Sequence, residues 1–223
     1  MKKVENKDPE VIEIKNKYKK IRNSILLVVL ILLIIFFIAL SVKTIKVQEL
    51  LRANLTESYG NNYKMTRTDY GGAIIYFKDG NKLQRNGESA GTLSYDGKGY
   101  VLNFETKEYW DIPLEVGIFA RENMVVSNCM ALSGEEVNSF FKMISHVIYS
   151  GIKLGEENFN GVECYTISAN NNSMKIWFDK ETKYIIREGF SGNLSDVKIE
   201  PGIVKNEDII IPWEQGFVKG NVN

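Results

Sequence analysis

The side chains suited to nucleophilic or metal chemistry are few in this sequence. His146 is the only histidine, and Cys129 and Cys164 are the only cysteines. A cysteine nucleophile needs a neighbouring base, but nothing in the spacing places a thiol beside His146, which on a helical wheel lies opposite the apolar side and faces water. One histidine and two distant cysteines also fall short of a zinc ligand set. We therefore expect no catalytic residue, no metal and no cofactor.

Two pairs of adjacent acidic residues are the remaining candidates for acid–base chemistry. Glycoside hydrolysis uses two carboxylates, which Glu135-Glu136 or Glu156-Glu157 could supply. The first pair is explained more simply by the positive end of a helix, and the second by a solvated strand edge. The sequence contains no phosphate loop, no dinucleotide fingerprint and no Gly-x-Ser-x-Gly elbow. We expect that the protein is not an enzyme, with a glycosidase as the weaker alternative.

The larger set of candidate functional residues is apolar. These residues could line a ligand cavity between a curved sheet and a helix: Tyr100, Leu102, Phe104, Phe140, Phe141, Ile144, Ile176 and Phe178. The alternative for each is an ordinary dry core. Trp110, Trp177 and Trp213 are large enough to anchor a partner, or they too belong to the core.

A charge-free apolar segment near the N-terminus indicates that a domain with such a cavity would be attached to a membrane. Residues 24–42 contain no charged side chain and no polar stripe. As a helix, these 19 residues would extend about 28 Å, the thickness of one hydrocarbon core. The sequence predicts a single transmembrane helix over 24–42.

The orientation follows from the charges on either side of this segment. Residues 1–23 carry eight basic and four acidic side chains, and basic flanks stay in the cytoplasm. We expect a cytoplasmic tail (1–23) and an extracytoplasmic domain (43–223) at the cell membrane. The alternative is a signal peptide cleaved near Ala39-Leu40-Ser41; the long charged region and long apolar run favour a retained anchor.

The predicted exported domain carries 20 basic and 24 acidic side chains. Such a mildly acidic domain has no electrostatic footprint for nucleic acid. Its location on the oxidising side would allow a disulfide between Cys129 and Cys164. Two buried, free cysteines are the equal alternative.

The domain must position its apolar residues through helices and short strands. Apolar spacing predicts a helix over 44–59, and β-prone runs follow at 63–68, 73–78, 82–85, 92–95, 99–105 and 108–111. Turn pairs such as Asp79-Gly80 and Asp96-Gly97 separate them, as in antiparallel hairpins. Further strands are predicted at 152–158, 162–169, 174–179, 184–190, 196–200 and 208–211.

A second helix interrupts these strands. Ser133 and Glu136 form a capping-box pattern, and Gly151 ends the helix. Six apolar residues then fall on one helix side, which must lie on the sheet: Val137, Phe140, Phe141, Ile144, Val147 and Ile148. The expected fold is α+β, a curved antiparallel sheet of about nine to eleven strands, in effect a half-open barrel. Helices cover its concave side, and one transmembrane helix precedes it.

Two motifs give this layout a family resemblance. The Tyr95-Asp96-Gly97-Lys98 turn with the aromatic strand after it resembles a hairpin of bacterial lipoprotein-carrier domains of the LolA/LolB-like superfamily. Trp177-Phe178-Asp179, with Thr182 beyond, resembles their later strand and turn. The superfamily includes LppX-type carriers, RseB-type sensors and germination lipoproteins. The Pro that usually follows the Thr is absent here.

The resemblance implies an unclosed barrel around an apolar cavity beneath helical lids. It also implies an arginine that locks the lid, for which Arg67 and Arg85 are the positional candidates. A tethered domain cannot shuttle between membranes, so we expect binding of a lipid, lipopeptide or other apolar ligand rather than transfer. The alternative is an envelope interaction or signalling protein that docks a partner enzyme or receptor without a ligand.

Overall fold

A computed structural model describes residues 9–68, 72–113, 123–170 and 173–220. The chain divides into two compact units, Met1–Lys43 and Thr44–Asn223.

The first unit is helical. Helix α1 extends over Pro9–Arg52 and contains the apolar segment, whose side chains are exposed over most of its length. Among the described residues, α1 is the one helix long and apolar enough to cross a membrane, with a mean hydropathy of 3.6 over its most apolar 18 residues. It is compatible with a single membrane span or a signal helix. The predicted tail lies outside the described residues from 1 to 8 and is helical from Pro9 onward.

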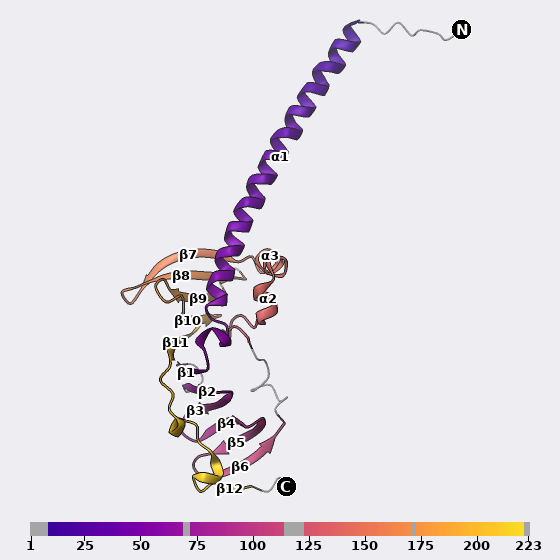
Figure 1. The fold of residues 1–223 in the computed structure, drawn as a ribbon. Helices are drawn as coiled ribbons and strands as arrows, with labels where there is room; N and C mark the ends of the chain where they lie inside the picture. The colour runs from indigo at the N-terminus through magenta and orange to yellow at the C-terminus, as the bar shows by residue number, and fades with distance from the viewer. Residues whose placement is uncertain (1–8, 69–71, 114–122, 171–172, 221–223) are drawn as a thin grey trace, which may run out of the picture. The chain divides into compact units, whose positions relative to one another are not determined.

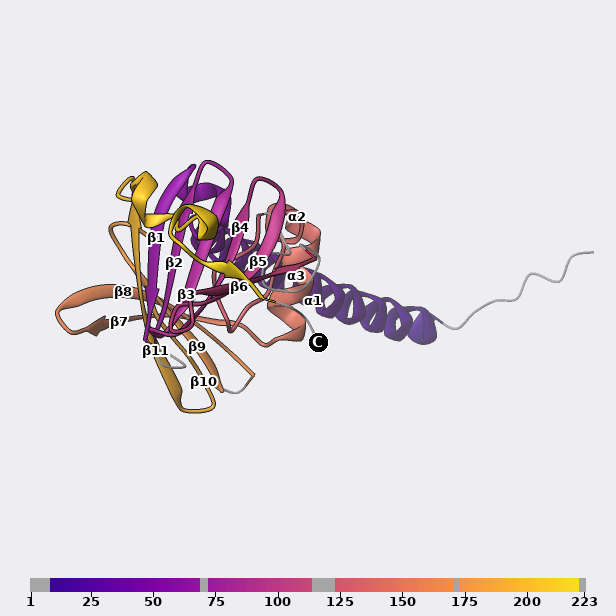
Figure 2. The same ribbon diagram turned by 90° about the horizontal axis from the view of Figure 1, so that it is seen from below.

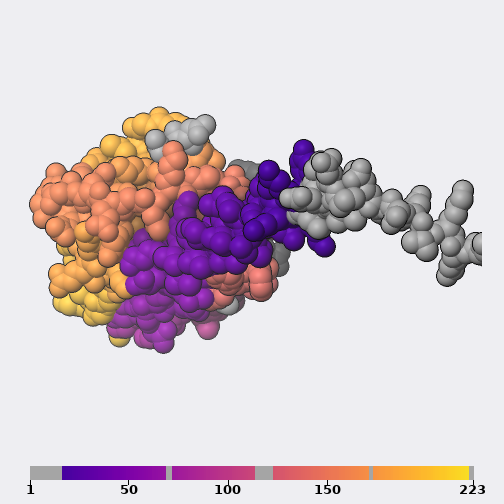
Figure 3. Space-filling view, turned by 90° about the horizontal axis from the view of Figure 1, so that it is seen from above, coloured from indigo at the N-terminus to yellow at the C-terminus, as the bar shows by residue number. Residues whose placement is uncertain are grey.

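The second unit begins with the last turns of α1. Residues Val47, Leu50 and Leu51 are fully buried, in contrast to the apolar residues before them. Atoms of later segments surround this part of the helix in the space-filling view (Figure 3). The helix ends at Arg52 rather than near residue 59, and a short 3-10 helix, η1 (Thr56–Tyr59), follows it.

One curved, open sheet of twelve strands dominates the second unit (Figure 1). The order across it is β12-β6-β5-β4-β3-β2-β1-β11-β10-β9-β8-β7, with β12 paired parallel to β6 and the other neighbours antiparallel. The strands are β1 (Asn62–Arg67), β2 (Ala73–Lys78), β3 (Asn81–Asn86), β4 (Ala90–Tyr95), β5 (Lys98–Asn103), β6 (Glu108–Ile112), β7 (Lys153–Phe159), β8 (Val162–Ala169), β9 (Met174–Asp179), β10 (Ile185–Phe190), β11 (Asn193–Pro201) and β12 (Val218–Lys219). The α+β class and the curved sheet are therefore confirmed.

The C-terminal segment departs from the prediction. The strand expected at 208–211 does not form, and residues 206–214 instead contain the 3-10 helices η2 (Asn206–Asp208) and η3 (Pro212–Glu214). Pro212 lacks a backbone N–H and cannot donate to a sheet ladder, which disfavours a strand here. The segment then adds β12, which the sequence did not predict, at one edge of the sheet (Figure 2).

The register shows which side chains share a face of the sheet, because directly paired residues point the same way. Ile176 on β9 pairs with Glu188 on β10, and Glu188 pairs with Ser195 on β11. Val197, two residues further along β11, pairs with Arg67 on β1. The same face then continues through β2, β3 and β4 to Val101 on β5. We call this side the Ile176 face. Tyr100 and Leu102 alternate with Val101 and therefore lie on the opposite side, the Leu102 face.

The two halves of the sheet bury different faces. On β8–β10 the Ile176 face holds four fully buried side chains: Ile167, Ile176, Phe178 and Ile185. On β3–β5 the Leu102 face holds the core instead, where Leu83, Leu93, Tyr100 and Leu102 pack against Val204, Ile209 and Phe217 of the C-terminal segment. Burial on the first half is not exclusive to one face, since Cys164 and Trp177 on the other side are also buried.

The predicted second helix is two helices, α2 (Gly134–Asn138) and α3 (Phe140–Tyr149). The Ser133 capping box is confirmed, but Ser139 takes an extended conformation and caps α3 in turn. This break changes which apolar residues point inward. Met143 and Val147 are buried, whereas Phe141 is 80% exposed, so the prediction that Phe141 and Ile148 lie on the sheet was wrong.

Candidate functional site

A buried ion pair on the Ile176 face joins β1 to β10. The Arg67 guanidinium and the Glu188 carboxylate bond to each other, and their side chains are only 7% and 2% exposed. Ser127 donates a hydrogen bond from its hydroxyl to Glu188 Oε2 (2.6 Å), and the Asn128 backbone N–H donates to Oε1 (3.1 Å). Arg67 also donates to the Val126 carbonyl oxygen (3.3 Å). This one polar cluster thus joins strands β1 and β10 to the segment that contains residues 126–128.

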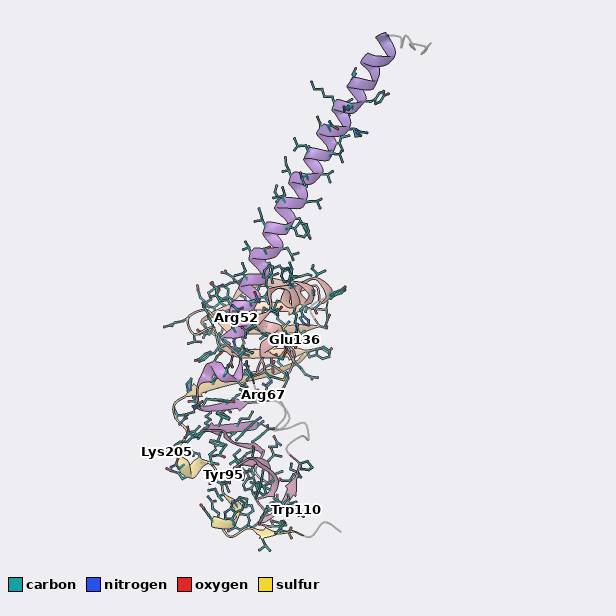
Figure 4. The ribbon with its side chains drawn as sticks, turned by 45° about the vertical axis from the view of Figure 1, so that its right-hand side comes forward. Arg52, Arg67, Tyr95, Trp110, Glu136 and Lys205 are labelled. Atoms are coloured by element: carbon teal, nitrogen blue, oxygen red, sulfur yellow. The ribbon has the colours of Figure 1, made fainter. Side chains whose placement is uncertain are left out.

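We call residues 123–131 the cover segment, because it crosses the Ile176 face at this cluster. Its backbone is fixed beside the ion pair: Val126 N–H donates to the Asn54 carbonyl, and Val125 N–H to the Leu132 carbonyl. A buried charge needs several partners to offset its desolvation. Here the partners other than Arg67 and Glu188 themselves come from the cover segment. The buried ion pair is therefore fully hydrogen-bonded only when the cover segment is in place. Figure 4 labels Arg67 at this position, midway along the domain.

A cavity of about 580 Å³ lies between the cover segment and strands β1–β3. Its lining is partly apolar, from Tyr63, Met65, Ile75, Met124 and Val125, and partly polar, from Arg67, Lys82, Gln84, Asn86, Ser127 and Asn128. Sites for small molecules have this size and this mixture of apolar walls with a few polar groups. We call it the cover groove.

Two titratable groups show how dry this part of the domain is. Burial raises the pKa of the Tyr63 phenol to about 12. Burial also lowers the pKa of the Lys82 ammonium, whose charged form is disfavoured away from water. An anionic group entering the cover groove would favour the charged form of Lys82 again.

A second cavity of about 590 Å³ lies on the other side of the ion pair. Asn128 and Glu188 line it together with Cys129 and with Phe190 and Leu194 from the β10–β11 hairpin. The two cavities share Asn128. The cover segment therefore separates two hollows on one face of the sheet.

The structure does not gather the eight predicted cavity residues at one place. Ile176 and Phe178 are fully buried on the Ile176 face, while Tyr100 and Leu102 belong to the core on the opposite face, with Phe104 packed against it. On α3, Phe140 and Ile144 are half-buried and Phe141 is exposed. Tyr100 does line a cavity, but one on the Leu102 face. No single hollow among the described residues is lined by this set.

The structure also shows the surroundings of the two cysteines and the histidine. Cys129 and Cys164 are not joined by a disulfide, so of the two alternatives the structure has two separate thiols. These thiols donate to the Gly189 and Val162 carbonyls. His146 lies 3.6 Å from Glu136 and is partly exposed. In the described parts of the chain, no three His, Cys, Asp or Glu side chains cluster as metal ligands.

The acidic pairs are accounted for by local structure. Glu136 accepts hydrogen bonds from Ser133, chiefly from its backbone, which lowers the pKa of the Glu136 carboxyl. Hydrogen bonding to Lys175 lowers the pKa of Glu157. Each of these two carboxylates thus has a hydrogen-bonding partner in its own part of the fold.

Sequence reasoning missed Glu188, the cover segment and the lining of the cover groove. Arg67 had been singled out by position alone. A sequence signal did exist: Arg67 and Glu188 are charged residues at alternating positions that are otherwise apolar or small within predicted strands. A charge at such a position is rare unless it is paired.

Comparisons with known proteins assign no family to the chain. No protein-family model matches it, and no curated protein matches it. Among solved structures, one match is an uncharacterized conserved protein from Thermus thermophilus. It is 11% identical, the match covers 78% of this chain and 99% of that protein, and the TM-score is 0.45.

Proposed function

We propose that this chain is a membrane-tethered extracytoplasmic binding domain that holds a lipid, lipopeptide or similar amphiphile in the cover groove. The observation that carries the proposal is the cavity of about 580 Å³ between β1–β3 and the cover segment. The proposal treats the twelve-stranded sheet as a half-open barrel and the cover segment as its lid.

The chemistry of the groove suits an amphiphile with an anionic head group. Met65, Ile75 and Val125 offer an apolar wall, while Lys82 offers a cationic group whose lowered pKa reflects its desolvation. An anionic head group would bring an opposite charge beside Lys82, and opposite charges attract each other more strongly where water is excluded. An acyl chain would remove water from the apolar wall at about 25 cal/mol per Å².

The tether follows from α1. The exposed part of this helix is apolar, with a mean hydropathy of 3.6 over 18 residues, and such a surface needs an apolar environment. The eight basic residues before position 24 support a cytoplasmic N-terminus. The second unit would then remain near the outer surface of the cell membrane and bind what it meets there.

Native mass spectrometry of the full chain, released from detergent micelles, tests the proposal. Adducts of lipid mass should accompany the purified protein. The variant Ile75→Trp, which fills the groove, should lose them. Val101→Trp is the matched control, because Val101 lies on the same face two strands beyond the groove wall and should leave the adducts unchanged. Protein that is empty and ignores added phospholipid would refute ligand binding.

A second candidate function is docking of an envelope protein without a ligand. The exposed side of α3 favours it, since Phe141, Ile148 and Tyr149 are 80%, 56% and 90% exposed. Large apolar side chains grouped on one helix commonly mark interaction sites. Cross-linking in cells from position 149 would give one stoichiometric partner if this is the function, and Phe141→Ser would abolish it. Native mass spectrometry would then show no lipid.

A further inference from the structure

We propose a second binding site, for a saccharide, at the far end of the Leu102 face. The site lies between the β5–β6 hairpin, η3 and β12, where a cavity of about 540 Å³ is lined by Tyr100, Tyr109, Asp111, Trp213 and Lys219. It is on the opposite side of the sheet from the cover groove, so it is independent of the function proposed above. Tyr95, labelled in Figure 4, marks this end of the domain.

An aromatic cluster forms one wall of the site. The Trp213 ring meets three tyrosine rings edge-on, with centroid distances of 5.9 Å to Tyr95, 5.5 Å to Tyr100 and 6.2 Å to Tyr109. Edge-to-face contacts of this kind hold rings rigidly. Even so, Trp213 remains 47% exposed. A fixed, half-exposed indole is a flat apolar surface that needs no ordering when a ligand covers it.

Polar groups stand beside this aromatic wall. Asp111 and Lys219 form an ion pair at the rim, and Lys98 also lines the cavity. Burial, and after it the nearby Asp111 carboxylate, raises the pKa of Tyr100, so that its hydroxyl stays protonated as a donor. The site therefore offers a carboxylate acceptor, two ammonium donors and tyrosine hydroxyls within one cavity.

A sugar ring matches this combination. A pyranose has a face of C–H groups, which packs on an aromatic ring, and a rim of hydroxyls that both donate and accept hydrogen bonds. Two lysines against one aspartate make the lining net positive, which disfavours the ammonium ligands that aromatic cages otherwise select. An acyl chain is disfavoured because the ion pair would lose water without gaining a partner. The lining accepts neutral sugars and favours acidic ones.

Isothermal titration calorimetry on the full chain in nanodiscs tests the site. The probes are chitotetraose as a neutral saccharide and tetragalacturonate as an acidic one, with choline and AMP as competing ligand classes. We expect saturable binding of at least one saccharide. Trp213→Ala should weaken it about tenfold, as the loss of one stacked ring implies. Trp213→Phe, which keeps a ring, should weaken it less.

Two further variants separate binding from folding. Asp111→Asn should weaken saccharide binding while leaving the melting temperature within about 2 °C, because its exposed ion pair stabilises little. Ile203→Ala is the matched control: Ile203 is also 47% exposed and lies in the same C-terminal segment, away from the cavity. It should bind like the wild type. Absence of saccharide binding, equal binding by Trp213→Ala, or preference for choline or AMP would overturn the proposal.

Discussion

The half of the sheet formed by β8–β10 and the half formed by β3–β6 differ in the face that they bury. On β9, Ile176 and Phe178 point into the core and are fully buried. On β5, Tyr100 and Leu102 lie on the opposite face, the Leu102 face, where they pack with Phe217 of the C-terminal segment. One continuous sheet thus supports two cores, and each core needs its own cover.

This difference explains where the hollows occur. On β3 and β4 the Ile176 face carries small or polar residues such as Gln84, Thr92 and Ser94, which cannot form a core. The cover groove lies at the edge of this region, where β1 still has apolar side chains and β3 has polar ones. The cavity therefore has both apolar and polar lining residues, because the buried face of the sheet changes between its two halves.

The largest expected effect comes from the polar cluster at the junction of the two halves. Glu188→Leu leaves the Arg67 guanidinium buried without its carboxylate and should lower the free energy of unfolding by about 3–5 kcal/mol. Chemical denaturation of the full chain in micelles measures this. The double variant Arg67→Met/Glu188→Leu should recover much of the loss. If Glu188→Leu and the double variant are equally unstable, the cluster holds the cover segment by shape rather than charge.

The exchange of faces is tested by truncating side chains on both faces of one strand. Leu102→Ala should cost about 2–5 kcal/mol, because it opens a hole in the Leu102 core. Val101→Ala, on the adjacent position and opposite face, should cost less than about 1 kcal/mol. Ile176→Ala on β9 should again be costly, and chemical denaturation measures all three. Equal losses for Leu102→Ala and Val101→Ala would show that β5 buries both faces.

The dryness of the cover groove is tested at alkaline pH. The pKa of Tyr63 is raised to about 12, so the folded state keeps the phenol proton while the unfolded state loses it near pH 10. Stability from this group is complete below pH 10 and declines as the pH rises toward 12, by about 3 kcal/mol in all. Tyr63→Phe should make that decline shallower in pH-dependent denaturation curves. Burial also raises the pKa of the neighbouring Tyr59, which should account for the part of the decline that remains.

Phe77→Leu is the matched control for the alkaline experiment. The Phe77 ring stacks on Tyr63 with centroids 5.1 Å apart, so the variant disturbs the same packing without removing a titratable group. It should lower stability at every pH and keep the alkaline slope. A slope that disappears in Phe77→Leu as well would mean that Tyr63 is not the group responsible.

The smallest expected effect concerns α2. Ser133→Ala removes the cap that accepts a hydrogen bond from the Glu136 N–H (3.2 Å) and should cost about 1 kcal/mol. The melting temperature reports the loss. Ser145→Ala is the control, because its hydroxyl bonds within α3 to the Phe141 carbonyl and caps nothing. A loss in Ser145→Ala as large as in Ser133→Ala would argue against the capping box as the cause.

Local features of the fold could be predicted from the sequence, because they depend on neighbouring residues. The Ser133 capping box and the turns at Asp79-Gly80 and Asp96-Gly97 are of this kind, and both turn aspartates adopt positive φ. The break at Ser139 could not be predicted, since the apolar spacing of residues 137–148 continues across it. With this break, Val137 of α2 and Met143 of α3 are both buried, and burial of this kind depends on tertiary packing.

The candidate site was harder to predict, for a reason of register. Alternation within β5 shows that Tyr100 and Leu102 share a face with each other, but not whether they share it with Ile176. That relation passes through seven strand pairings, from β9 through β10, β11, β1, β2, β3 and β4 to β5. A one-residue shift at any of them would reverse the answer. Four of the eight residues proposed for the cavity are buried, namely Tyr100, Leu102, Ile176 and Phe178, and they are divided between the two faces of the sheet.

An open sheet with twelve strands has two free edges, and these edges have consequences in a crowded solution. At one end β12 has only two residues, too few to recruit another strand. At the other end β7 is seven residues long and mostly exposed, but Glu156 and Glu157 occupy its centre. Two copies of β7 aligned antiparallel about that centre would set carboxylate against carboxylate, which is destabilising. Neutralising both glutamates should therefore make the domain prone to aggregate edge to edge.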